Sequence, residues 1–314
     1  GGVGTTFEAI ELAGGQSEIK RGQGQLRLHG ESFDDLGVVF EGDLDIRDTS
    51  IVAGLPLKDI DGVVHINGAY EKERLSELDL ILDMERLSLA GRTVTDVGGV
   101  LRLDAAQEIL RLEDVRGWSS GGVLAVTGSV GIGDRTEFDV TVLLDGVQLA
   151  SADAKDAVAR LEGALTAWFG VAGDRGNMNS RHGRGRVTVR NGNLATIPAS
   201  MQALRILEFT PPTADVIDHA DIELYLRGDE LVLESIWLED SNAAGTPFIM
   251  TGTGTIAYPE MEVHAILKPR AGWAGLRDIA GVITDALFVV DVSGPLLDPT
   301  VSVVVLPSFA PSSQ

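Results

Sequence analysis

Histidine and carboxylate side chains are the groups in this chain that could hold a metal or transfer protons. The five histidines lack the His-x-His or His-Glu-x-x-His spacing that brings two imidazoles to one zinc ion. They are His29, His65, His182, His219 and His264. Carboxylates stand in pairs at Asp34-Asp35, Asp43 with Asp45, and Glu239-Asp240, but no twelve-residue calcium loop surrounds them. With 47 Asp and Glu residues such pairs arise by chance, so we expect no catalytic residue, metal or cofactor.

Among the Gly-x-Gly sequences of this chain, we compare three with the start of a dinucleotide-binding fingerprint. They lie at Gly22 and Gly24, Gly183 and Gly185, and Gly252 and Gly254. Each lacks the third glycine and runs into a strand pattern where the fingerprint requires a helix. We interpret them as bends at which strands begin. The segment Gly117-Trp-Ser119-Ser-Gly121 has the Gly-x-Ser-x-Gly spacing, but it lacks the local context of a nucleophile elbow.

Basic residues gather in one place, from Arg175 through Arg181 and His182 to Arg190. Guanidinium groups match the geometry of phosphate oxygens, so Arg184, Arg186 and Arg190 are candidates for contact with an anionic head group or a partner. The other interpretation is a solvated face whose arginines pair with acidic neighbours. We favour the second, because such surface pairs are common and individually weak.

Alternating apolar residues predict the elements that position these groups. Short strand patterns follow one another from Leu26 to Leu144, with Gly, Asp or Asn between them, as in hairpin-connected antiparallel strands. We count Val38–Phe40 and Leu44–Ile46 as separate strands, and likewise Leu78–Leu82 and Leu87–Leu89. The expected fold is mainly β: an elongated, curled antiparallel sheet, groove-like or a partly open barrel. Residues 1–150 form a repeated β region, and residues 151–314 form a second β region.

Two or three short amphipathic helices complete the prediction. The firmer ones lie near residues 198–208 and 273–287, and a third is indicated at residues 152–160. Neither firm helix has the dense basic face of a membrane-surface helix, so we expect both to pack on the sheet.

One face of the second β region is expected to be apolar. Val187 and Val189 share a face with Gly185, while Arg184, Arg186 and Arg190 share the opposite face. The candidates for the lining of a groove are Val187, Val189, Ile222, Leu224, Leu226, Leu231, Leu233, Val263 and Leu267.

Charge and composition exclude several classes of partner. The net charge of −22 repels phosphate backbones, so we expect no nucleic-acid partner. No run approaches the 18 or so apolar residues of a membrane helix. Because the chain begins at Gly1 without Met, we expect a piece of a longer protein, with any anchor elsewhere.

The order of motifs from residue 183 onwards resembles the C-terminal region of the AsmA-like family. The motifs are Gly183-Arg-Gly185-Arg-Val187-Thr-Val189, the later Gly252-Thr-Gly254-Thr-Ile256, and the closing Gly294-Pro-Leu-Leu-Asp298-Pro299. The resemblance covers about the last 130 residues. It implies a periplasmic protein tethered to the inner membrane by a segment that this chain lacks, with a β-groove serving lipid movement between the membranes and outer-membrane homeostasis. The family brings no catalytic residues to transfer.

Two functions therefore remain. An apolar groove binds or conducts phospholipid acyl chains or a similar ligand, since apolar contact needs no specific recognition residue. Envelope proteins then contact the ends of the groove. Alternatively, the face is packed against itself and the chain is a structural or assembly module of an envelope complex. A carbohydrate-binding β-solenoid is disfavoured by the aromatic content of 5%. The deciding feature is whether the interior is open.

Overall fold

The computed structural model describes most of the chain. The described residues are 2–7, 10–12, 17–19, 21–30, 37–53, 55–71, 74–89, 92–132, 135–149, 163–192, 217–240, 248–257, 260–271, 288–295 and 299–305. They form two compact units. The N-terminal unit contains residues 1–147 and 172–176, and the C-terminal unit contains residues 148–171 and 177–314.

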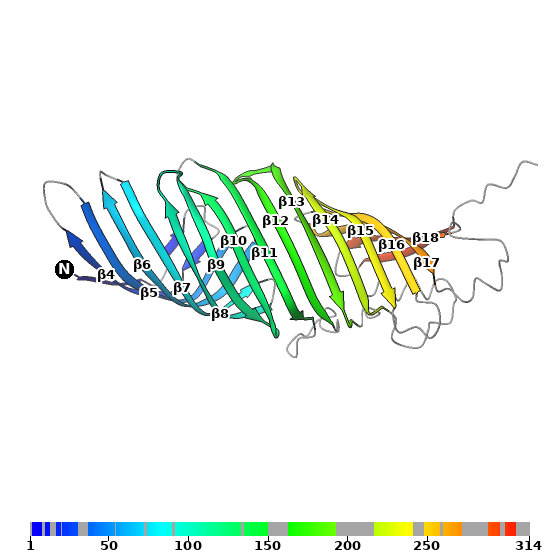
Figure 1. The fold of residues 1–314 in the computed structure, drawn as a ribbon, viewed down its shortest axis with the longest axis horizontal. Coiled ribbons are helices and arrows are strands. Elements are labelled where there is room, and N and C mark those ends of the chain that lie inside the picture. Colours follow the sequence, from blue (N-terminus) through cyan, green and yellow to red (C-terminus); the bar gives the residue numbers. More distant parts are fainter. Residues whose placement is uncertain are drawn as a thin grey trace, which may run out of the picture. The chain divides into compact units, whose positions relative to one another are not determined.

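The N-terminal unit is a series of antiparallel strands in which long strands pair with their neighbours along the chain (Figure 1). The strands are β1 (Gly2–Phe7), β2 (Ile10–Leu12), β3 (Ser17–Ile19), β4 (Arg21–Gly30), β5 (Gly37–Ala53), β6 (Leu55–Glu71), β7 (Arg74–Leu89), β8 (Arg92–Asp104), β9 (Ile109–Ser119), β10 (Gly122–Gly131) and β11 (Glu137–Gln148). β1 pairs with β4, and the short β2 and β3 form a hairpin that touches β5.

The C-terminal unit repeats this arrangement. Its strands are β12 (Ala164–Asp174), β13 (Asn177–Arg190), β14 (His219–Arg227), β15 (Glu230–Asp240), β16 (Phe248–Ala257), β17 (Glu262–Ala271), β18 (Phe288–Pro295) and β19 (Thr300–Val305). From β13 to β19 each strand pairs antiparallel with the next. In the described part of either unit, no pairing joins the first strand to the last, so neither series closes into a barrel.

The mainly β, antiparallel fold is confirmed, with two corrections to the expected strands. Val38–Phe40 and Leu44–Ile46 both belong to β5, and Leu78–Leu82 and Leu87–Leu89 both belong to β7. Gly42 and Asp43 do not break β5, because Gly42 takes an inner position opposite Ile66 while Asp43 faces outward. The predicted helices at 152–160, 198–208 and 273–287 lie outside the described residues, and the described residues contain no helix.

Each unit has its own apolar core on one face of its strands. Residues directly opposite in an antiparallel pair share a face, so the register defines rows that cross the sheet. In the N-terminal unit one such row runs through Gly42, Ile66, Leu80, Leu101, Leu112 and Gly128. The centre of this core is formed by Ile46, Ile60, Met84, Val94, Val97 and Leu124.

Four aspartates with left-handed backbone interrupt these strands at β-bulges. Asp48, Asp59, Asp96 and Asp114 have φ angles of 49°, 51°, 51° and 50°. Each lies where the pairing register shifts. The extra residue turns the following side chain toward the core, where Thr49, Ile60 and Val97 are at most 5% exposed. The bulges therefore maintain an apolar inner face along strands of 11 to 17 residues.

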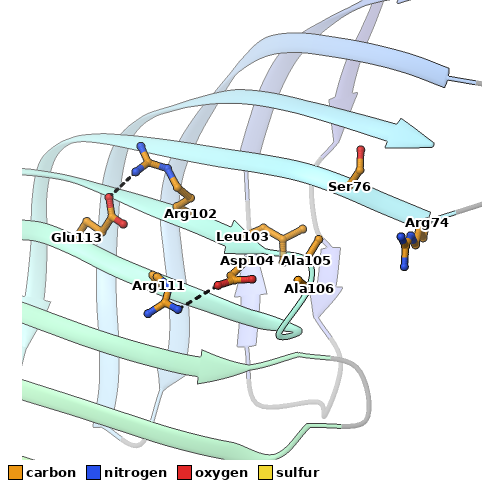
Figure 2. A pocket seen from close by; sticks show the side chains of 9 residues that line it. All are labelled: Arg74, Ser76, Arg102, Leu103, Asp104, Ala105, Ala106, Arg111 and Glu113. Atoms are coloured by element: carbon orange, nitrogen blue, oxygen red, sulfur yellow. Dashed lines mark hydrogen bonds and ion pairs between the residues drawn. The ribbon is translucent and has the colours of Figure 1, made fainter. Parts of the chain in front are cut away.

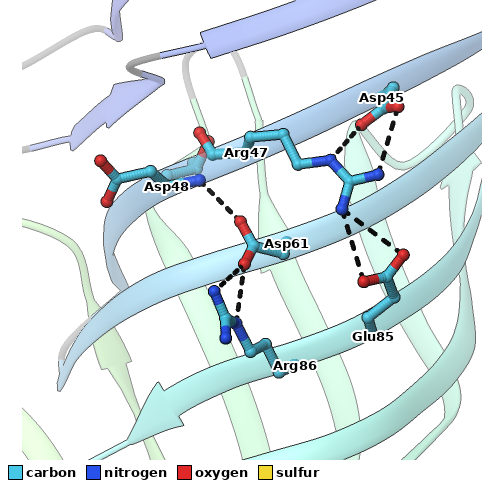
Figure 3. A network of polar contacts seen from close by, with 7 residues as sticks. Asp45, Arg47, Asp48, Asp61, Glu85 and Arg86 are labelled. Carbon is cyan, nitrogen blue, oxygen red and sulfur yellow. Dashed lines mark hydrogen bonds and ion pairs between the residues drawn. The ribbon is translucent and has the colours of Figure 1, made fainter.

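Asp61 joins three of these strands through a polar network (Figure 3). Its carboxylate accepts a hydrogen bond of 2.8 Å from the backbone N–H of Asp48 and one of 2.7 Å from Nε of Arg86. Arg47 forms a second set of ion pairs with Asp45 and Glu85. Asp61 is only 7% exposed, and the Asp48 hydrogen bond, helped by Arg86, lowers its pKa against the opposing effect of burial.

Candidate functional site: the apolar face of the C-terminal unit

Four rows of apolar side chains cross the sheet of the C-terminal unit. The first contains Gly183, Leu226, Leu231, Ile256, Val263 and Gly294. The second contains Gly185, Leu224, Leu233, Gly254, Ala265, Val292 and Val301. The third contains Val187, Ile222, Ile236, Gly252, Leu267 and Val290, and the fourth Val189, Ala220, Leu238 and Met250. We call this surface the apolar face.

Burial changes along the apolar face. Toward β17 and β18 it is tightly packed, with Val290 1%, Ala265 4% and Val292 8% exposed. On β14, by contrast, Ile222, Leu224 and Leu226 are half-buried. The described strands contact chiefly their neighbours in the sheet. The apolar side chains of β14 therefore keep some exposed area, whereas Leu233 and Ile236 of the neighbouring β15 are buried.

The nine predicted lining residues all fall on the apolar face. Val189, Leu233 and Val263 are buried, at 7 to 8% exposed. The half-buried ones are Val187, Ile222, Leu224, Leu226, Leu231 and Leu267. Six of the nine share one packed cluster: Ile222, Leu224, Leu231, Leu233, Val263 and Leu267. Their common face is a structural fact, whereas a ligand on it is a proposal.

The interpretation of the Gly-x-Gly motifs as strand starts is wrong for the two motifs in this unit. Gly183 and Gly185 lie within β13, and Gly252 and Gly254 lie within β16. All four belong to the apolar face, where a neighbour occupies the space of a side chain. A Cβ on Gly252 would lie 2.6 Å from Cδ2 of Leu267, and one on Gly185 would lie 2.5 Å from Cδ2 of Phe169. The glycines therefore let large side chains lie close to the strand.

The three predicted head-group arginines lie exposed on the opposite, outer face of β13. Arg186 donates from Nε to Asp221 at 2.8 Å, and this carboxylate raises the pKa of Arg186 above its usual value. Arg184 lies 3.7 Å from Glu234. Arg190 forms no ion pair with the described residues. Pairing with acidic neighbours, the favoured interpretation, thus accounts for Arg184 and Arg186.

Arg181 differs from the other basic residues of β13. It lies on the apolar face, two positions before Gly183, and its carbonyl accepts a hydrogen bond of 2.8 Å from the Gly228 N–H. Its Nε atom is buried and has no hydrogen-bond partner among the described residues. Sequence reasoning grouped Arg181 with the outer arginines. Its odd-numbered position, shared with Val187 and Val189, is the signal that separates it.

The described residues of each unit include a shallow depression. The depression of about 580 Å³ in the N-terminal unit contains three arginines (Figure 2). Arg102 is held by Asp79 and Glu113, and Arg111 by Asp104, so carboxylates neutralise these two arginines. The other, about 550 Å³, is lined by His182, Gly183, Arg184, Tyr225, Leu226 and Arg227.

Within the described ranges, no group of three or more His, Asp or Glu side chains is arranged to hold a metal ion. Those ranges also contain no helix with the length and apolar character needed to cross a membrane. No family model matches the chain, and neither a curated protein nor a solved structure shows significant similarity to it. The AsmA-like resemblance therefore rests on the sequence motifs.

Proposed function

We propose that the apolar face of the C-terminal unit binds phospholipid acyl chains or a similar apolar ligand, as a non-enzymatic module. The observation that supports this is the half-buried area on β14, where Ile222, Leu224 and Leu226 lie opposite apolar residues of β13 and β15. Burying apolar surface releases about 25 cal/mol per Å², without directional contacts. A chain of methylene groups is matched by such a surface and moves along it with little change in free energy.

The AsmA-like motifs extend this proposal to a setting. In this proposal, the protein lies in the periplasm and is tethered to the inner membrane by a segment outside this chain. There it contributes to lipid movement toward the outer membrane. Envelope proteins at the ends of the groove are the partners of that arrangement. The strongly acidic net charge is consistent with a protein that has no nucleic-acid partner.

A photo-crosslinking amino acid at Leu224 tests the proposal. The half-buried Leu224 side chain lies on the apolar face, whereas that of its neighbour Glu223 is exposed on the outer face. We expect the protein purified from cells to carry lipid crosslinked at position 224 and not at position 223. Native mass spectrometry of the unmodified protein should then show the same lipid. Equal crosslinking at both positions, or a lipid-free protein, would contradict the proposal.

A structural or assembly module is the second candidate. It is favoured by the tight packing near β18, where neighbouring side chains of the protein leave Val290 only 1% and Val301 only 4% exposed. A lipid-free protein in the experiment above supports this function. Loss of an envelope complex on deletion of the C-terminal unit, with lipid content unchanged, would support it further.

A further inference from the structure

Arg181 is a cation at the margin of the otherwise apolar face. Gly183 is opposite Leu226, so Arg181 lies on β13 two residues beyond the first row, which contains Leu226 and Leu231. Leu226 is its diagonal neighbour on the same face. The half-buried part of the apolar face thus ends at a guanidinium group.

The Nε atom of the Arg181 guanidinium group is buried without an acceptor among the described residues. A buried N–H donor without a partner costs about 1–3 kcal/mol, and more when the group is charged. Nε of Arg181 is such a donor among the described residues. The outer arginines differ, because Arg186 has Asp221 and the side chain of Arg184 is 73% exposed to water.

The other arginines near this end of β13 are already paired. Arg227 lies 3.3 Å from Glu230, and Arg184 lies 3.7 Å from Glu234. Both arginines line the second depression, together with Leu226 of the apolar face. Arg181, by contrast, forms no ion pair with the described residues, so an anion at this end of the strand would pair with Arg181.

We propose that Arg181 binds the anionic head group of an amphiphile whose acyl chain lies along Leu226, Leu224 and Ile222. A carboxylate or phosphate oxygen accepts a hydrogen bond from the guanidinium group, and the acyl chain covers the half-buried side chains of β14. The inference rests on the proposed function and deepens it, since it names an acid with an acyl chain as the ligand. A free fatty acid and an anionic phospholipid share this chemistry.

Fluorescent titration with cis-parinaric acid and with its methyl ester tests the proposal on the delipidated chain. The ester keeps the chain and removes the negative charge. We expect Arg181→Gln to weaken binding of the acid about tenfold or more, as for a lost charge-assisted hydrogen bond, and to leave binding of the ester unchanged. Arg184→Gln, on the same strand but the outer face, should change neither. Arg181→Lys should restore part of the affinity for the acid.

The remaining outcomes separate the two proposals. If acid and ester bind equally and Arg181→Gln changes neither, the apolar face binds chains but Arg181 has no role. If Arg184→Gln weakens the acid as much as Arg181→Gln, long-range charge explains the effect and the inference is overturned. If neither ligand binds any variant, the proposed function fails and the inference fails with it. Where the acid does bind, competition by phosphatidylglycerol or by oleate identifies the source of the head group. Equal thermal unfolding midpoints of the variants exclude misfolding as the cause of a difference.

Discussion

At the scale of single residues, Asp61 is the clearest case of a polar group that stabilises the fold. Its pKa is lowered in the folded protein, mainly by the hydrogen bond from the Asp48 N–H. A carboxylate with a depressed folded pKa stabilises the protein above its unfolded pKa of about 4, and this stability is lost as the pH falls through the folded value. Asp61→Asn places an amide N–H₂ against Arg86 and removes the charge.

We expect Asp61→Asn to reduce the free energy of unfolding by about 1–3 kcal/mol at pH 7. The difference from the unchanged protein should shrink as the pH falls from about 4 through the lower folded pKa of Asp61, below which both side chains are uncharged. Urea unfolding across this pH range measures it. Asp114→Asn is the control, since the Asp114 side chain is 84% exposed and its pair with Arg116 is a surface pair. A difference that stayed constant down to pH 2.5 would show that charge has no part in it.

Two adjacent glycines test the role of glycine on the apolar side of the sheet. A Cβ on Gly99 would lie 2.6 Å from Cα of Val115, whereas the nearest atom to one on Gly98 is the Leu82 carbonyl oxygen at 3.8 Å. We expect Gly99→Ala to cost about 1–3 kcal/mol, because a Cβ overpacks the core and because the φ of 156° at Gly99 strains an L residue. Gly98→Ala should be neutral within about 0.5 kcal/mol. Thermal unfolding of the two variants compares them. Equal effects would mean that strand flexibility, not space, accounts for these glycines.

At the scale of elements, the alternation of apolar residues was sufficient to predict antiparallel strands and to place nine residues on one face. The prediction of strand ends failed where one strand contains several alternating segments. Gly and Asp end strands in most sequences, but in this protein they lie within β5. The bulges were missed for a related reason. Their signal is the repeated Asp-(Ile/Val)-x-Gly at Asp59–Gly62, Asp96–Gly99 and Asp114–Gly117. The buried state of Nε in Arg181 depends on packing across strands, which one sequence does not reveal.

The bulge at Asp96 makes this element-scale interpretation testable. Asp96 is exposed and has a φ of 51°, a conformation that Asn adopts readily and a β-branched residue avoids. We expect Asp96→Asn to be neutral and Asp96→Val to destabilise the protein by about 1–2 kcal/mol, although Val is the better strand former. Guanidinium unfolding would measure both. Greater stability of the Val variant would show that this strand does not need the left-handed residue.

At the scale of the whole molecule, a net charge of −22 acts against the folded state through self-repulsion. Most of the described ion pairs are between half-exposed side chains and contribute little each, as at Arg102 with Asp79 and Arg116 with Asp114. The repulsion among the excess negative charges therefore outweighs the attraction within these ion pairs. We expect the thermal midpoint to rise by a few degrees between 10 mM and 500 mM sodium chloride, as the screening length falls from about 30 Å to only a few ångströms.

The choice of salt decides what this experiment reports. Sulfate also strengthens apolar burial, so chloride isolates screening from the hydrophobic term. The variant Asp61→Asn gives an internal check. The nearly buried ion pair of Asp61 with Arg86 is screened less than surface charges, so the lower stability of this variant should persist at 500 mM sodium chloride. A midpoint that falls with chloride would show that the outer-face ion pairs, as at Arg186 with Asp221, together outweigh the net repulsion. Those pairs would then be a principal support of the sheet, and the apolar face would carry less of its stability and be freer to exchange a ligand.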